Sequence, residues 1–275
     1  MVPWQDRLYL GTWQLGGDFS RQVYERRELL IQQAWRAGVK RFDTAAVYGR
    51  GKVEESLGNI LPIEAHIVTK IPAVRKPEAN PTDQAGNLYP KEWLKRQLAF
   101  SQNRLGRIPS TVLLHNWARC WKSGDDLTPL EFLKEQKDRG QLGRFGISLP
   151  DGFGVIPSNE VLEIIDVLEV PANSSETWVF PWIGTLLACG VEVLIRSIFL
   201  QGTLLKNSNQ WEAMDQCDIR HKKYSPQQVI NPQRPENLLR EAWGRNTSVV
   251  IGMTSIEQLN QNIAVVREGE YDAKE

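Results

Sequence analysis

Short apolar runs alternate with longer amphipathic segments along most of the chain. The runs are rich in Val, Ile and Leu and are bounded by turn-forming residues, which is typical of strands buried on both faces of a parallel sheet. The segments between them place apolar residues three and four positions apart, the spacing of an amphipathic helix. The pattern predicts strands at residues 8–11, 39–42, 65–69, 112–114, 144–148, 166–170, 191–195 and 248–251.

A helix is expected after each strand, and Gly or Pro stands near several of the predicted helix ends. The expected helices cover residues 24–37, 52–60, 93–105, 128–139, 159–165, 179–188, 235–243 and 255–267. About eight strand and helix pairs in 275 residues predict a (β/α)8 TIM barrel, folded as a single domain over residues 1–275.

Three connections are too long for ordinary links between a strand and a helix. They cover residues 71–90, 116–126 and 197–226, and each follows a predicted strand. Long ordered connections in a compact domain are usually functional, and those that follow barrel strands lie at the catalytic face. We therefore expect these three segments to form a substrate pocket.

Four titratable residues stand at or near the ends of predicted strands. Asp43 and Tyr48 follow the second strand, Lys70 ends the third and His115 ends the fourth. Taken singly, each has a simple structural role available, such as a capping carboxylate or a core aromatic ring. The carboxyl ends of parallel barrel strands share one rim, however, so we expect the four side chains to converge there.

With these residues in that order, the chain resembles the aldo-keto reductases. The resemblance covers nearly the whole chain, and the spaced set of Asp43, Tyr48, Lys70 and His115 is its most specific part. The segments that carry it are Gly11–Gly17, Phe42–Gly49 with Glu54, Val68–Lys70, Leu113–Asn116, Gly143–Ser148, Arg196–Ser197 with Leu200–Gly202, Val250–Gly252 and Gln258–Asn262.

The resemblance implies reduction of an aldehyde or ketone to an alcohol with NADPH, and with NADH as a possible substitute. Tyr48 would be the general acid. Lys70 would bring the pKa of the phenol down toward neutrality, and Asp43 would keep Lys70 charged and oriented. His115 would hydrogen-bond the carbonyl oxygen and orient the substrate.

The cofactor contacts are also implied by the resemblance. They would come from Gly11, Thr12, Trp13, Asp43, Ser148, Glu169, Arg196, Ser197, Leu200, Gly202, Gly252, Thr254, Gln258 and Asn262. The chain departs from the family at two positions: Leu149 follows Ser148 where Asn is common, and Glu169 stands where Gln is usual. The substrate pocket would be walled by Trp13, Tyr48, His115 and Trp117.

The segment expected to hold the 2′-phosphate of NADPH carries no cation. Residues 252–262 offer hydroxyl and amide groups and the N-terminus of the last helix, which can bind an anion through its backbone. A charge-assisted contact is roughly twice as strong as a neutral one. We therefore expect NADPH to be preferred over NADH by only about tenfold, unless Arg196 or a residue of 197–226 supplies the cation.

Two functions from other classes stay open. The same acid and base groups could run a redox-neutral elimination or isomerisation, and the fold could serve as a cofactor-binding regulatory subunit. A buried ion pair has little structural benefit over apolar packing, so the intact four-residue set argues against a purely regulatory role.

Composition narrows the partners. Lys plus Arg and Asp plus Glu both total 33, so the formal net charge of zero gives no general electrostatic case for nucleic acid or membrane. The three cysteines, Cys120, Cys189 and Cys217, lack metal-ligand spacing, and we expect no metal site. No apolar run is long enough to span a bilayer. We expect a cytoplasmic enzyme with a small-molecule carbonyl partner; the sequence does not specify its oligomeric state.

Overall fold

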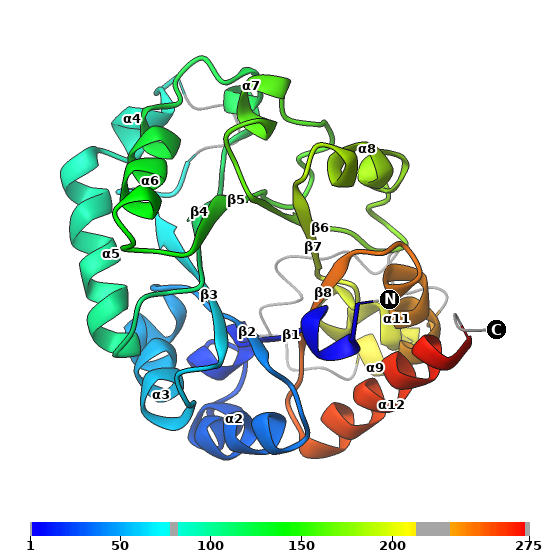
Figure 1. The fold of residues 1–275 in the computed structure, drawn as a ribbon. Coiled ribbons are helices and arrows are strands. Elements are labelled where there is room, and N and C mark those ends of the chain that lie inside the picture. Colours follow the sequence, from blue (N-terminus) through cyan, green and yellow to red (C-terminus); the bar gives the residue numbers. More distant parts are fainter. Residues whose placement is uncertain (1, 78–81, 213–231, 273–275) are drawn as a thin grey trace.

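Eight parallel strands close into a barrel in sequence order, with β8 pairing back to β1 (Figure 1). The computed structural model describes residues 2–77, 82–212 and 232–272. The prediction of a (β/α)8 TIM barrel is confirmed. The strands are β1 (Leu8–Gly11), β2 (Arg41–Asp43), β3 (His66–Pro72), β4 (Thr111–His115), β5 (Arg144–Ser148), β6 (Val167–Pro171), β7 (Glu192–Arg196) and β8 (Ser248–Gly252).

Helices surround the barrel, as Figure 1 shows, and bury their apolar faces against the outside of the strands. They are α1 (Arg21–Glu25), α2 (Arg27–Arg36), α3 (Lys52–Ile60), α4 (Ala85–Leu88), α5 (Lys91–Leu105), α6 (Thr128–Asp138), α7 (Asn159–Leu162), α8 (Ile183–Ala188), α9 (Ser208–Glu212), α11 (Pro235–Trp243) and α12 (Ile256–Asp272). None of the helices in the described part of the chain combines the length and apolar character that crossing a bilayer requires.

Several element boundaries differ from the predictions. The helix expected at 24–37 is split into α1 and α2, because Arg26 leaves helical geometry at φ −96° and ψ 4°. Strand β2 begins at Arg41 rather than 39, because the Val39 N–H is bonded to Ala34 O at the end of α2. The helix expected at 159–165 ends at Leu162, and β3 continues to Pro72.

The inside of the barrel is filled by a small apolar cluster. It contains Tyr9, Val68, Leu113, Val167, Leu194 and Val250, one residue from each of six strands. Gly146 on β5 lets the neighbouring strand approach, because a Cβ there would lie 1.7 Å from Val167 O. The barrel is therefore a packed core below its rim, and not a pore.

The amino end of the barrel is closed by a charged cluster centred on Glu192. Its carboxylate accepts hydrogen bonds from Ser248 Oγ at 2.7 Å and from the Tyr9 hydroxyl at 3.3 Å, and it forms an ion pair with Arg144. Arg41 Nη1 donates to the Tyr9 hydroxyl at 3.0 Å. This end is held by ion pairs and hydrogen bonds among these side chains, whereas the opposite rim carries the open site.

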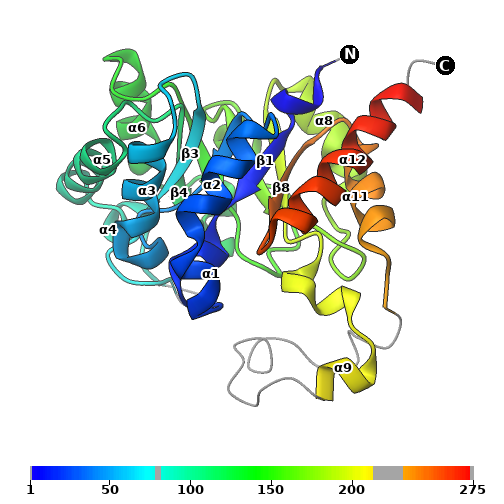
Figure 2. The ribbon, with the colours of Figure 1, turned by 90° about the horizontal axis from the view of Figure 1, so that it is seen from below.

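Figure 2 shows the described residues 197–212 of the connection after β7, which include α9, extending away from the barrel body on the side where α1 lies. This is the rim side, because the connection leaves the carboxyl end of β7. The long segments therefore lie where catalytic residues collect in this fold.

Candidate active site

The connection from β2 to α3 places Asp43 and Tyr48 at the rim. Asp43 is the last residue of β2, and Tyr48 begins a 3-10 turn that ends at Gly51. Gly49 has φ 55°, and a Cβ there would lie 3.0 Å from Gly16 O. Only glycine lets these two loops touch, and that contact holds Tyr48 against the loop after β1.

Lys70, on β3, is fully buried beside Asp43. Its ammonium donates to Asp43 Oδ1 at 2.5 Å and to Thr44 O at 3.1 Å, and its side chain is 1% exposed. The Lys70 Nζ atom lies 5.7 Å from the centre of the Tyr48 ring. The side chains expected to meet from β2 and β3 are therefore close together.

His115 ends β4 and faces Tyr48. The two ring centroids are 6.2 Å apart and the ring planes are nearly perpendicular, at 84°. The His115 carbonyl accepts a hydrogen bond from the buried Tyr89 hydroxyl. The structure thus brings Asp43, Tyr48, Lys70 and His115 together at one rim.

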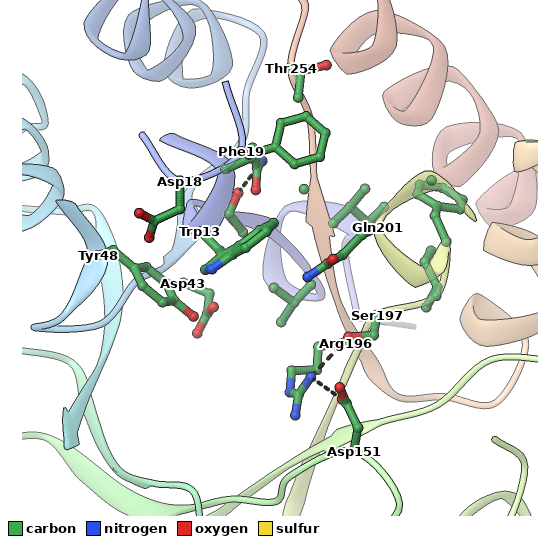
Figure 3. A pocket seen from close by; sticks show the side chains of 18 of the residues that line it. Trp13, Asp18, Phe19, Asp43, Tyr48, Asp151, Arg196, Ser197, Gln201 and Thr254 are labelled. Atoms are coloured by element: carbon green, nitrogen blue, oxygen red, sulfur yellow. Dashed lines mark hydrogen bonds and ion pairs between the residues drawn. The ribbon is translucent and has the colours of Figure 1, made fainter. Parts of the chain in front are cut away.

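A cavity of about 960 Å³ opens at this rim (Figure 3). In Figure 3, Tyr48 and Asp43 enter the cavity from one side, and Arg196 with Asp151 enters from another. Trp13 lies between the Tyr48 and Asp43 pair and Gln201. The residues expected at the site that line it are Gly11, Trp13, Asp43, Tyr48, His115, Glu169, Arg196, Ser197, Gly202, Gly252, Thr254, Gln258 and Asn262.

Four other expected site residues lie behind the wall. Lys70 does not line the cavity, but it donates a hydrogen bond to Asp43, which does. Thr12 is buried, and its hydroxyl donates to Asp43 O at 2.8 Å. Ser148 is buried and donates to Glu169 Oε1 at 2.9 Å. Leu200 packs against the apolar side chains of Leu204 and Leu238, so it shapes the loop after β7 rather than the cavity surface.

The expectation that Trp117 walls the pocket is corrected. Its side chain is 0% exposed, stacks edge-on against Trp121 at 5.3 Å and donates from Nε1 to Trp121 O. The aromatic wall is instead made by Trp13 and Phe19, whose ring centroids are 5.9 Å apart. Phe19 lies in the loop after β1, a connection of ordinary length that nothing in the sequence marked as a wall.

The three long connections contribute unequally to the cavity. The described part of 71–90 supplies Lys76, and 116–126 supplies Asn116. The connection 197–226 supplies most of one side, from Ser197 to Gln210, while residues 213–226 lie outside the described residues.

Two further acidic residues reach the cavity without having been expected. Asp18 follows β1, and Asp151 follows the Leu149–Pro150 pair after β5. Arg196 Nη1 donates to Asp151 Oδ1 at 3.0 Å, and its Nη2 donates to Leu149 O at 2.6 Å. The segment after Ser148, where the sequence has Leu149 and Pro150, therefore anchors Arg196.

The sequence profile described as the aldo/keto reductase family matches residues 7–170. The chain belongs to this family. A curated relative, pyridoxal 4-dehydrogenase of Microbacterium luteolum, is 30% identical over 131 residues, which cover 39% of this chain and 38% of the relative. The chain thus spans less than two fifths of the length of the curated relative that it matches.

Solved structures resemble the whole barrel. Glycerol dehydrogenase from Gluconobacter oxydans is 19% identical with a TM-score of 0.72, covering 98% of this chain and 90% of that one. An aldo-keto reductase from Klebsiella pneumoniae in complex with NADPH is 19% identical with a TM-score of 0.64, covering 95% and 85%. At this identity the likeness shows the fold alone.

Opposite charges alternate across the site of this aldo/keto reductase. Lys70 Nζ lies 2.5 Å from Asp43 Oδ1 and 3.2 Å from Glu169 Oε2. Glu169 Oε1 lies 3.4 Å from Arg196 Nε, and Arg196 continues to Asp151. The contacts link β2, β3, β6, β7 and the loop after β5. In the described part of the chain, no cluster of three or more His, Cys, Asp or Glu side chains could hold a metal.

Burial decides the protonation of the two aromatic groups. It raises the pKa of Tyr48 to about 12, and the charge of Lys70 only partly opposes this. Burial also lowers the pKa of His115 to about 3, with Lys70 acting in the same direction. The expected fall of the Tyr48 pKa toward neutrality does not occur, so the phenol and the imidazole are both neutral at pH 7.

The charged groups behind them shift one another's pKa values. Burial favours the neutral amine of Lys70, but the carboxylates of Asp43 and Glu169 outweigh it and raise the pKa. Burial, and then the charge of Glu169, raise the pKa of Asp43. The opposing charges of Lys70 and Arg196 overcome burial for Glu169 and lower its pKa. Lys70 thus remains an ammonium at any pH of interest.

The far end of the cavity lies at the N-terminus of α12. Gln258 Oε1 accepts from the Thr254 N–H at 2.9 Å and from the Thr254 hydroxyl at 3.1 Å. A phosphate oxygen could take the place of that amide oxygen, because helix N-termini bind anions through such donors. Residues 252–262 contain no Lys or Arg, and Lys206 from the loop after β7 lines the same cavity. The donors and the cavity fit a dinucleotide phosphate.

Proposed function

We propose that this aldo/keto reductase reduces an aldehyde or ketone to an alcohol with NADPH, and more weakly with NADH. The observation that carries the proposal is the meeting of Asp43, Tyr48, Lys70 and His115 at one rim, with three of them lining the cavity. A cavity of about 960 Å³ has room for a nicotinamide and a small carbonyl compound together.

When bound, the nicotinamide would supply the hydride for the carbonyl carbon. Tyr48 acts as the general acid and donates its proton to the carbonyl oxygen. Lys70 stabilises the phenolate that remains, because its ammonium is the nearest positive charge to the Tyr48 ring. Asp43 holds Lys70 in place. His115 is neutral and hydrogen-bonds the same oxygen, which fixes the direction of approach.

The cofactor would lie along the cavity from the catalytic rim to α12. Its nicotinamide end would meet Trp13, Glu169 and Arg196, and its phosphates would meet Ser197 and the N-terminus of α12. The remaining proposed contacts are Gly11, Thr12, Asp43, Ser148, Leu200, Gly202, Gly252, Thr254, Gln258 and Asn262. The proposed enzyme is cytoplasmic and consists of a single domain.

The substrate would bind between Tyr48, His115 and the wall of Trp13 and Phe19. Two aromatic rings beside the carboxylate of Asp18 suit a small compound with an apolar face and polar groups at its edge. The relatives described as acting on glycerol and pyridoxal are likewise named for small polar substrates.

The test has a binding step and a turnover step. NADPH is titrated into the protein while the fluorescence of its ten tryptophans is followed, and loss of NADPH absorbance is then measured with a panel of small aldehydes and ketones. Tyr48→Phe should lower the reduction rate by about 10²–10⁴-fold while leaving the cofactor Kd nearly unchanged, since the phenol acts on the substrate.

Each other outcome points to another function. Full turnover in Tyr48→Phe removes the general acid from the proposal. Absence of cofactor binding favours redox-neutral elimination or isomerisation at the same rim. Tight cofactor binding with no turnover on any carbonyl favours a regulatory subunit.

A further inference from the structure

Lys70 binds two carboxylates rather than one. Asp43 Oδ1 lies 2.5 Å from Nζ on the β2 side, and Glu169 Oε2 lies 3.2 Å from it on the β6 side. All three side chains are almost completely buried, at 1–6% exposed. A Gln in place of Glu169 would leave Lys70 with a single counter-ion, so Glu169 adds a full negative charge beside the proposed general acid.

The geometry of Glu169 fixes that charge in place. Oε1 accepts from Ser148 Oγ at 2.9 Å and lies 3.4 Å from Arg196 Nε. Oε2 lies 3.2 Å from Lys70 Nζ without the alignment of a hydrogen bond, and the Glu169 carboxyl also interacts with that of Asp43. Its attraction to Lys70 is therefore mainly Coulombic, and it does not depend on a directional bond.

The charges facing Tyr48 come from every neighbouring strand. Asp43 and Glu169 contribute negative charge from β2 and β6, and Lys70 and Arg196 contribute positive charge from β3 and β7. His115 on β4 faces the ring as a neutral imidazole. Lys70 lowers the pKa of Tyr48, and the negative charges of Asp43 and Glu169 oppose it, so Glu169 offsets part of the stabilisation that Lys70 offers the phenolate.

We propose that Glu169 is a positioning residue that acts on Tyr48 through Lys70. Its carboxylate forms an ion pair with the Lys70 ammonium and offsets part of that positive charge at the phenol. It thereby controls how readily Tyr48 releases its proton. The effect on carbonyl reduction rests on the proposed function, whereas the effect of Glu169 on proton release by Tyr48 does not.

Burial gives a competing explanation, because it alone also keeps a phenol neutral. Glu169→Gln separates the two, since it preserves shape and burial and removes only the charge. The charges of Lys70 and Arg196 overcome burial and lower the pKa of Glu169, so its carboxylate is ionised at the alkaline pH where a phenol titrates, and the substitution removes that charge. Ser148→Ala is the matched control, because it removes a neutral partner of Glu169 and leaves every charge in place.

The experiment is an ultraviolet titration of tyrosinate in the cofactor-free protein. Subtracting the titration of Tyr48→Phe from that of the wild type isolates Tyr48, and the same subtraction is made in the Glu169→Gln background. The Tyr48 step should move to lower pH by about one pH unit or more in Glu169→Gln. It should stay in place in Ser148→Ala, and Glu169→Asp should move it in the same direction as Glu169→Gln but by less, because the shorter side chain withdraws the carboxylate from Lys70.

Superimposable Tyr48 steps in the wild type and Glu169→Gln overturn the proposal. If Glu169→Gln does not fold, the wild type and Glu169→Asp still decide. A wild-type step close to that of a free phenol, near pH 10, contradicts a suppressing charge, whereas a step near the Tyr48 pKa of about 12 that shifts as the shorter carboxylate withdraws supports it.

The pH profile of turnover provides an independent readout. In Glu169→Gln the alkaline limb of kcat/KM for carbonyl reduction should begin at lower pH, by the same interval as the Tyr48 step. Should the protein reduce no carbonyl at all, the titration still determines the role of Glu169. Should the titration show no effect, the proposed reduction stands without it.

Discussion

Tyr48 and His115 reach the cavity as neutral side chains with different capacities. With a pKa of about 3, His115 has no extra proton to give at pH 7, so it can orient a carbonyl but cannot act as its acid. Tyr48 still carries its proton at that pH and lies at van der Waals range of the imidazole. Burial is the largest cause of both pKa shifts, and it alone makes Tyr48 the proton donor and His115 the orienting group.

Lys70→Met should strongly destabilise the protein. The substitution leaves Asp43 and Glu169 facing each other without the ammonium, and uncompensated buried charge of this kind costs about 3–5 kcal/mol. Urea denaturation measures the free energy of unfolding. Tyr48→Phe is the control and should unfold near the wild-type midpoint. An unchanged midpoint in Lys70→Met would show that the carboxylates are solvated in the folded protein.

Strand ends could be located from the sequence, and contacts across the barrel could not. Asp43, Lys70 and His115 each end an apolar run, so parallel topology was enough to place them on one rim. The contact of Glu169 with Lys70 joins β6 to β3 through the interior, and it depends on the closure of the barrel. No local pattern around residue 169 carries that information.

At the scale of the secondary-structure elements, an aromatic cluster joins the loops after β3 and β4. Tyr89 contacts Trp121 edge-on at 6.2 Å, and Trp121 contacts Trp117 at 5.3 Å. The Tyr89 hydroxyl donates to His115 O, and Trp121 Nε1 donates to Asp83 O at 2.8 Å. The cluster fixes the backbone of His115 from behind and contributes no surface to the cavity.

Trp117→Ala and Phe19→Ala should therefore have opposite effects. Removing the buried Trp117 ring leaves a cavity and should reduce stability by about 3–5 kcal/mol, with little change in relative rates among carbonyl substrates. Phe19→Ala should change those relative rates and leave the melting temperature close to that of the wild type. A change of substrate preference in Trp117→Ala beyond that in Phe19→Ala would return Trp117 to the pocket wall.

The sequence could not tell these aromatic residues apart, because all of them stand in loops after barrel strands. The backbone decides. Asn116 has φ 66°, which turns the chain so that the Trp117 N–H bonds Ser148 O at 3.1 Å and the indole enters the core. Asn tolerates this left-handed backbone conformation, but the presence of an Asn in the sequence does not predict it.

In the proposed function, the N-terminus of α12 and the loop after β7 together determine the cofactor preference. NADPH should be favoured over NADH by about tenfold, because neutral donors replace the usual cation at α12. Lys206→Met should reduce this preference while leaving the Kd of NADH unchanged, since only NADPH carries the extra phosphate. Both Kd values are measured at low and moderate salt. A preference of a thousandfold or more that survives Lys206→Met would reveal another cationic ligand.

At the scale of the whole molecule, a buried histidine at the amino end of the barrel makes stability depend on pH. Burial lowers the pKa of His66, at the amino end beside Tyr9, to about 4. The unfolded chain binds a proton at His66 below about pH 6.5, whereas the folded protein binds it only near pH 4. Between these values the unfolded state holds more protons, so folding stability falls as the pH falls.

Unfolding free energies measured from pH 7 to pH 4 should show this loss, and His66→Gln should make it shallower by up to one bound proton. The comparison with wild type isolates His66 from His115, whose pKa is lowered in the same sense. Parallel pH curves for the two proteins would mean that His66 is protonated in the folded state. Catalytic activity should be little affected by His66→Gln, because the residue lies at the end of the barrel away from the rim.

The backbone of the rim holds conformations that stability alone does not favour. Among the described residues, Asn116, Ser197 and Gln201 have positive φ and line the cavity. Such geometry costs on the order of 1–3 kcal/mol per residue outside glycine. A population selected only for survival at high temperature would drift toward glycine at these three positions, while selection for turnover would keep the side chains.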